Sequence, residues 1–175
     1  MSDRLATYLH DHMAGSHFAI KLLESLQDQY RNEGLGRFAA DLAAEVKRDQ
    51  ETLQKIIDHV GKAHMDLTEA AGWFVEKASQ IKLHRDDSGA GLGTFEALET
   101  LGLGIRGKLA LWRVLPVIAE VDSQVPANDY AALAARADEQ HDRVENQRLR
   151  LALTTFTAEP ANSSQDSAPV DTIAS

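Results

Sequence analysis

The sequence predicts an all-α protein built as a four-helix bundle, and two observations carry this prediction. The first proline is Pro116, so long helices can form earlier in the chain without the residue that breaks them most strongly. Along four long segments the apolar residues recur with the helical period rather than the strand period of two. At 175 residues, of which 43% are hydrophobic, the chain can bury one substantial core.

The first two helices are predicted over residues 5–30 and from Phe38 to Val60. In each segment the apolar residues fall on one side at 100° per residue. Residues 31–36, which hold two glycines and an asparagine, predict a short turn between them. The second helix is expected to end near Gly61. The short turn makes these helices antiparallel neighbours.

Two further helices are predicted over residues 94–121 and 129–156. The earlier one is expected to bend or end near Pro116, and the later one follows a breaker that contains Pro126. Because this connection is also a short turn, the two helices should be antiparallel neighbours. Residues 1–156 are therefore predicted to form one bundle domain. Residues 157–175 are rich in Ala, Ser, Asp and Pro and lack a periodic apolar set, which predicts a disordered C-terminal tail.

A connection of about 30 residues separates the second long helix from the third. It is predicted to contain a shorter helix over residues 67–83, because Asp66 followed by Glu69 has the pattern of an N-terminal cap. A connection of this length can return along the whole bundle and leave the two helices parallel, as one long crossover. An up-down-up-down bundle, with the short helix lying across one end, remains the alternative.

The third long helix is apolar on two sides. Leu103 and Val114 lie opposite its core-facing residues, and Gly107 is one of three glycines that would let another backbone approach closely. Together with Trp73 of the connecting helix, these residues are the candidates for a homodimer interface. The alternative is that the connecting helix itself covers this side, and the two interpretations are compatible.

Composition and charge exclude several classes of function. The formal net charge of -9 gives no basic surface for nucleic acid. The chain has no cysteine, which excludes disulfides, thiol catalysis and cysteine-ligated metals within it. No secretion signal and no membrane-spanning stretch is evident, so we expect a cytoplasmic protein that does not enter the membrane.

Three short helical strings stand out in this helix order: Tyr8-Leu-His-Asp-His12-Met-Ala-Gly15, Ala70-Ala-Gly-Trp73 and Gly107-Lys-Leu-Ala-Leu-Trp112. With them, the chain resembles a group of bacterial proteins of the ferritin-like superfamily, and the likeness covers residues 5–156. The resemblance implies a ferritin-like four-helix bundle with a long crossover, which can be dimeric, and a superfamily in which many members bind two iron or manganese ions.

The metal centre of that superfamily uses Glu-x-x-His pairs, and this chain departs from the pattern. Glu45 is followed three residues later by Arg48, a cation that cannot bind a metal. The nearest match on the last helix begins with Asp138, a shorter acid, and reaches His141. Glu45 and Glu99 are therefore only weak candidate ligands, and a standard dinuclear centre is not expected.

Five polar residues lie on or beside apolar helix stripes, and buried polar groups need partners. They are His12, Asp49, Gln140, His141 and Arg148. One interpretation is a buried hydrogen-bonded network in which the histidines or Arg148 compensate Asp49. The other is a metal site, because two histidines and one carboxylate can bind iron, manganese or zinc.

These observations support two hypotheses of function from different classes. The first is a helical bundle that acts through association as a homodimer, with a degenerate or absent metal centre. The second is a ferritin-like metalloprotein that holds iron, manganese or zinc for redox or storage chemistry. No catalytic residue is assigned, and the sequence leaves open whether the protein is an enzyme.

Overall fold

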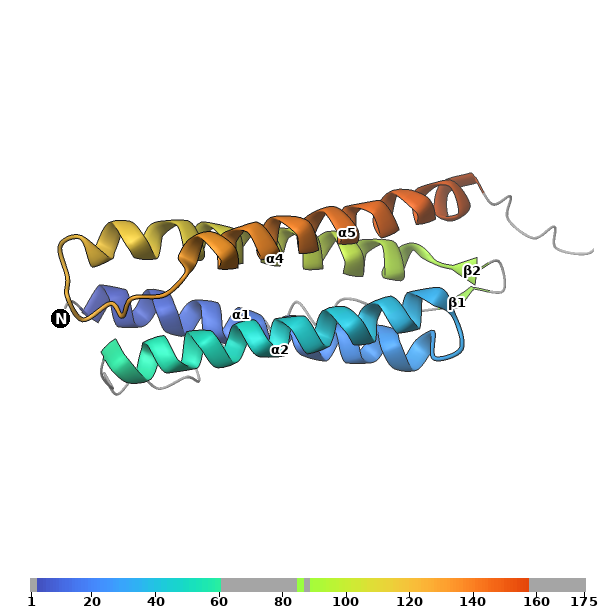
Figure 1. Cartoon of the computed structure of the whole chain (residues 1–175). Coiled ribbons are helices and arrows are strands. Elements are labelled where there is room, and N and C mark those ends of the chain that lie inside the picture. The colour runs from blue at the N-terminus through green and yellow to red at the C-terminus, as the bar shows by residue number, and fades with distance from the viewer. Residues whose placement is uncertain (1–2, 61–84, 87–88, 158–175) are drawn as a thin grey trace, which may run out of the picture.

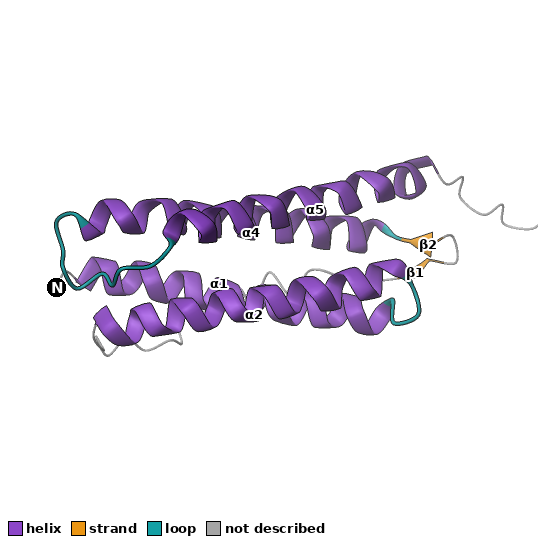
Figure 2. Cartoon of the chain, in the orientation of Figure 1, coloured by secondary structure: helices purple, strands orange, loops and turns teal. Residues whose placement is uncertain are grey.

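A computed structural model of the chain describes residues 3–60, 85–86 and 89–157. Four long helices account for most of them (Figures 1 and 2). They are α1 (Asp3–Gln29), α2 (Gly34–Val60), α4 (Leu92–Ala119) and α5 (Tyr130–Thr157). The predicted all-α four-helix bundle is thereby confirmed, with helix bounds that differ from the predicted ones by a few residues.

Local sequence explains where these helices begin and end. Asp129 precedes α5, and its carboxylate accepts a hydrogen bond from the backbone N–H of Ala132 at 3.0 Å, which caps the helix. Gly36 closes the turn between α1 and α2, since a Cβ at this position would lie 2.0 Å from the carbonyl oxygen of Tyr30. The exposed Pro116 lies in the last turn of α4, which ends three residues later at Ala119.

The helices form two antiparallel hairpins, α1 with α2 and α4 with α5. In the first hairpin Lys47 pairs with Glu24 at 2.8 Å, and Gln50 donates a hydrogen bond to the earlier Ser16. In both hairpins, a residue further along one helix contacts a residue earlier on the other, as antiparallel helices require. In the second hairpin, Arg106 of α4 pairs with Asp138 of α5, whereas Glu99, earlier on α4, pairs with Arg148, later on α5. These hairpins agree with the two short turns of the sequence.

The two hairpins pack so that α1 contacts α4 and α2 contacts α5. The hydroxyl of Tyr30, after the end of α1, lies 2.8 Å from that of Thr94 at the start of α4. Helices α2 and α4 consequently run in the same direction, at opposite corners of the bundle. Figure 1 shows that α2 ends at one end of the bundle whereas α4 begins at the other.

A short β-ladder precedes α4. Strand β1 (Arg85–Asp86) pairs antiparallel with β2 (Gly89–Ala90) at the end of the bundle where α1 and α2 are joined (Figure 1). The predicted connecting helix over residues 67–83 lies outside the described residues. The same holds for the predicted tail after Thr157.

One hydrophobic core runs between the helices. Its largest fully buried apolar side chains come from all four of them. They are Leu9, Leu23, Leu26, Leu42, Ile56, Leu98, Leu111, Trp112, Leu115 and Val144. Among the described residues, no helix combines the length and the apolar character needed to cross a membrane.

Candidate functional site

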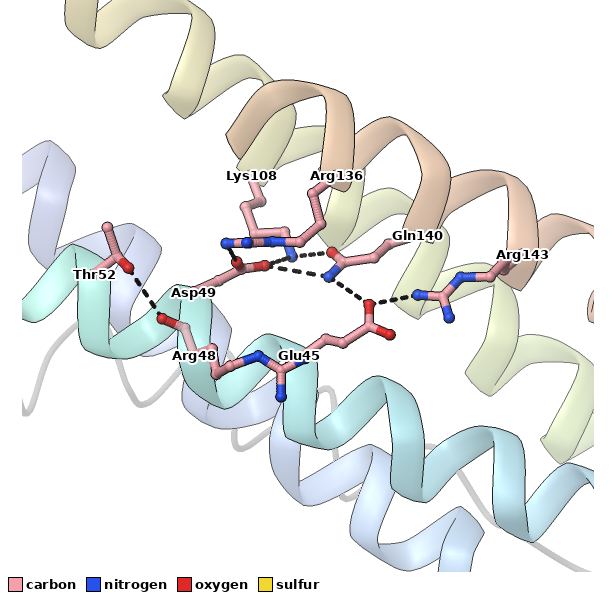
Figure 3. Close-up of polar contacts among 8 residues, drawn as sticks. All are labelled: Glu45, Arg48, Asp49, Thr52, Lys108, Arg136, Gln140 and Arg143. Atoms are coloured by element: carbon pink, nitrogen blue, oxygen red, sulfur yellow. Dashed lines mark hydrogen bonds and ion pairs between the residues drawn. The ribbon is translucent and has the colours of Figure 1, made fainter. Parts of the chain in front are cut away.

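The middle of the bundle holds a group of charged and polar side chains around Asp49 of α2, which is only 3% exposed. One of its carboxylate oxygens accepts a hydrogen bond from the ammonium group of Lys108 at 2.5 Å. The other accepts one from the guanidinium of Arg136 on α5. Because α2 and α4 occupy opposite corners, the Lys108 side chain reaches through the centre of the bundle (Figure 3).

Gln140 of α5 connects this pair to a second carboxylate, and its own side chain is fully buried. Its amide oxygen accepts a hydrogen bond from Lys108, and its amide nitrogen donates to Glu45 at 3.0 Å and to Asp49 at 3.4 Å. Arg143 donates to the same oxygen of Glu45 at 2.5 Å (Figure 3). We name these six residues the central polar cluster: Glu45, Asp49, Lys108, Arg136, Gln140 and Arg143.

The electrostatics of the central polar cluster follow from burial and from this pairing. Burial lowers the pKa of Lys108, and the neighbouring carboxylate of Asp49 opposes that shift. Burial alone would raise the pKa of Glu45, but hydrogen bonds from Arg143 and Gln140 bring it below its ordinary value. The two carboxylates face three cationic side chains, so the cluster carries a formal charge of +1.

A cavity of about 560 Å³ adjoins the central polar cluster and is lined by residues of α1, α2 and α4. Most of its wall is apolar, with contributions from Phe18, Leu53 and Leu111. Asp49 and Lys108 also line it, so the ion pair belongs to both features. A mainly apolar cavity of this size, with a few convergent polar groups, is typical of a small-molecule binding site.

Other polar side chains also line the cavity, among them Trp112 of α4 and Asp11 and His12 of α1. Trp112 lies one helical turn after Lys108 on the same face of α4, is 1% exposed, and has a buried indole N–H without a hydrogen-bond partner among the described residues. His12 packs edge-on against Tyr8, and burial lowers its pKa although the carboxylate of Asp11 opposes the shift. We call the part of the cavity wall formed by Asp49 and Lys108 its polar end.

The partners of Asp49 differ from those that the sequence predicted. His12 lines the same cavity as Asp49, whereas His141 lies beside Gly102 of α4 and places its Nδ1 3.5 Å from Asp142. Arg148 pairs with Glu145 and Glu99 and lies over the ring of Phe95. Arg148 follows Arg136 by twelve residues, about 18 Å along the helix, which removes it from the centre of the bundle.

The remaining candidates fall into separate places. Glu45 belongs to the central polar cluster, while Glu99 lies half exposed beside Arg148. Leu103 is 70% exposed and Val114 is partly buried. Gly107 faces α1, since a Cβ there would lie 3.9 Å from the ring of His12, and Trp73 lies outside the described residues.

Sequence reasoning missed Lys108 and Arg136 as the partners of Asp49, although one of them left a signal. Lys108 follows the core residue Leu101 by seven positions and precedes Trp112 by four, so it interrupts the buried stripe of α4. A lysine at such a position needs a buried acidic partner. Arg136 stands on α5 with its side chain partly exposed and offered no comparable signal.

The donor set does not fit the metal centre that the superfamily resemblance implies. The carboxylates of Glu45 and Asp49 are already bonded to cationic side chains of the protein itself. In the part of the chain that the structure describes, no three side chains of His, Asp or Glu come together in a group that could hold a metal ion. Comparisons with protein-family models, curated proteins and solved structures found no match to this chain.

Proposed function

We propose that the protein binds a small, mainly apolar molecule in the cavity between α1, α2 and α4. The observation that carries this proposal is the cavity itself, about 560 Å³ in volume, with a mainly apolar wall on which the Asp49–Lys108 ion pair also lies. A cavity of this size with few polar groups is typical of small-molecule sites. Burial of an apolar ligand against this wall would supply the binding free energy.

The central polar cluster then has a structural role, which is to hold the walls of the cavity in register. Its ion pairs join α2 to α4 and α5, the helices that approach one another at the bundle centre. We also propose a ferritin-like arrangement for the chain, supported by two antiparallel hairpins in which α2 and α4 run in the same direction. In this arrangement internal cations neutralise the carboxylates that a metal would otherwise bind.

A neutral apolar fluorescent probe, N-phenyl-1-naphthylamine, tests the binding proposal. We expect saturable binding with one site per chain and at least tenfold weaker binding by Gly104→Leu, because Gly104 lines the cavity and has open space around it. The matched control is Gly34→Leu, a helical glycine that also has open space but does not line the cavity. Equal affinity of Gly104→Leu and the wild type would overturn the proposal.

Added metal ions distinguish this proposal from the metalloprotein hypothesis. If the central polar cluster binds no metal, adding Fe(II), Mn(II) or Zn(II) should leave the melting temperature unchanged, because the carboxylates of Glu45 and Asp49 are already paired with cationic side chains. A rise that disappears in both His12→Ala and His141→Ala would instead support a metal site, despite the pairing of these carboxylates.

A second candidate function, association as a homodimer, is favoured by the outer side of α4. Leu103, Val117 and Val121 are 70%, 60% and 88% exposed. With Ala110 and Val114 they recur at spacings of three, four and seven residues, the pattern by which one helix packs along another. We propose that α4 of a second copy occupies this side.

Sedimentation of two variants tests the association. Leu103→Glu and Val117→Glu should give a monomer without loss of helix content, because both side chains are exposed in the single chain. The control is Leu153→Glu, which changes an equally exposed leucine on α5 and should leave the dimer intact. A wild-type protein that sediments as a monomer at micromolar concentration would contradict this proposal.

A further inference from the structure

We propose that the cavity binds a free monocarboxylate with an apolar body, whose carboxylate lies at the polar end beside Lys108. This inference rests on the proposed function, because it names the chemical class of the molecule in the same cavity.

The hydrogen-bonding groups at the polar end are donors in excess. The oxygens of Asp49 already accept from Lys108, Arg136 and Gln140. Lys108 carries three N–H donors, of which two point to Asp49 and Gln140. A molecule that binds here must therefore bring acceptor atoms rather than donors.

Charge selects a carboxylate among the possible acceptors. The central polar cluster behind the polar end has a formal charge of +1, which a carboxylate would neutralise. A buried carboxylate needs such a cation together with hydrogen-bond donors, because it loses its hydration on binding. An ammonium group at the same place would meet Lys108, a like charge, and would find few free acceptors.

The rest of the wall determines the body of the ligand. Phe18, Leu53, Ile105 and Leu111 line the cavity, and its volume of about 560 Å³ falls within the range of small-molecule sites. Burial of apolar surface on these side chains would supply most of the binding free energy, while the polar end fixes the orientation. An unbranched alkyl carboxylate is the simplest molecule with both parts.

Three probes with the same ten-carbon chain test the inference on the whole protein at pH 7.5: decanoate, decan-1-ol and decylammonium. Each is titrated against bound N-phenyl-1-naphthylamine. We expect decanoate to bind at least tenfold more tightly than decan-1-ol, and decylammonium to bind most weakly. Lys108→Met should remove the preference for decanoate over decan-1-ol, whereas the control Lys55→Gln, at an exposed lysine of α2, should retain it.

Lys108→Gln provides a second variant in case Lys108→Met does not fold. Its amide keeps a hydrogen-bond donor for Asp49 but removes the cation, so decanoate should lose its preference over decan-1-ol, whose own affinity should not change. Equal affinities of the three probes in the wild type would overturn the carboxylate inference and leave the apolar cavity as a binding site. Failure of every probe, including N-phenyl-1-naphthylamine, to bind would overturn the proposed function itself.

Discussion

The two hairpins meet along two lines of contact that differ in chemistry. The α1–α4 contact is largely apolar and carries one buried hydroxyl pair, Tyr30 with Thr94. The α2–α5 contact carries the ion pairs of Glu45 and Asp49 with Arg143 and Arg136. Apolar contacts are non-directional, so they stabilise the bundle without requiring one particular alignment of the helices. Ion pairs to buried carboxylates form only when the two helices are aligned so that the charged groups meet.

Within one bundle, the apolar contacts can therefore supply most of the stability while the ion pairs determine how the helices are aligned. Burying a carboxylate costs desolvation, which its attraction to a guanidinium offsets only when the geometry is good and the remaining atoms are hydrogen-bonded. Gln140 supplies part of these bonds, because it links Lys108 to both carboxylates, whereas the Nε atoms of Arg136 and Arg143 have no partner among the described residues. The α2–α5 contact therefore favours a single register, and the cavity beside it inherits a fixed polar end.

The largest expected effect comes from removing the carboxylate of Asp49. Asp49→Ala should lower the free energy of unfolding by about 3–5 kcal/mol, because Lys108 and Arg136 would remain buried or partly buried without their partner. Asp49→Asn should cost less, because its amide oxygen can still accept a hydrogen bond. Urea denaturation measures both values.

The control for this experiment is Asp41→Ala, an exposed aspartate on the same helix. It should change the free energy of unfolding by less than about 0.5 kcal/mol. If Asp49→Ala cost no more than Asp41→Ala, the ion pairs would have no structural role and the contrast between the two contacts would disappear.

A smaller effect is expected at the apolar α1–α4 contact. Tyr30→Phe removes one hydroxyl and leaves that of the fully buried Thr94 without this partner, which should cost about 1–3 kcal/mol. The double variant Tyr30→Phe, Thr94→Val removes both hydroxyls and should recover part of that loss. Thermal and urea unfolding would show this recovery, and a double variant worse than the sum of the single ones would count against it.

The smallest effect is a dependence of stability on pH through His12. Burial lowers the pKa of His12 below its ordinary value of 6.5, so the unfolded chain binds a proton more readily than the folded one. Stability should therefore fall as the pH drops below about 6.5. His12→Gln should reduce the fall in melting temperature between pH 7.5 and 5.5, whereas the exposed His59→Gln should leave it unchanged. An identical fall in all three proteins would contradict this assignment.

Much of the fold could be predicted from the sequence because each long helix carries its own apolar stripe. Short turns at residues 31–36 and near Pro126 were sufficient to predict the two antiparallel hairpins. The helix bounds were less accurate, since α2 begins at Gly34 rather than at the predicted Phe38. Asp49 stood out as a polar residue within an apolar stripe, and the structure buries it.

The partners of Asp49 could not be predicted in the same way. Helical angles place Cα atoms, whereas the charged groups of Lys108 and Arg136 lie at the ends of long side chains that cross the space between helices. The relative rotation and height of the two hairpins decide which of these groups meet. His141 and Arg148 had suitable positions along α5 by angle alone, but the packing brought Arg136 and Gln140 to Asp49 instead.

A double-mutant cycle tests the central claim, that Asp49 is neutralised by cations of the protein itself, most directly. The cycle combines Asp49→Asn with Arg136→Met and, in parallel, Asp49→Asn with His141→Gln, each measured by urea unfolding. We predict a coupling of about 1–3 kcal/mol between Asp49 and Arg136, which are in contact, and a coupling near zero between Asp49 and His141. A strong coupling with His141 and none with Arg136 would contradict the account.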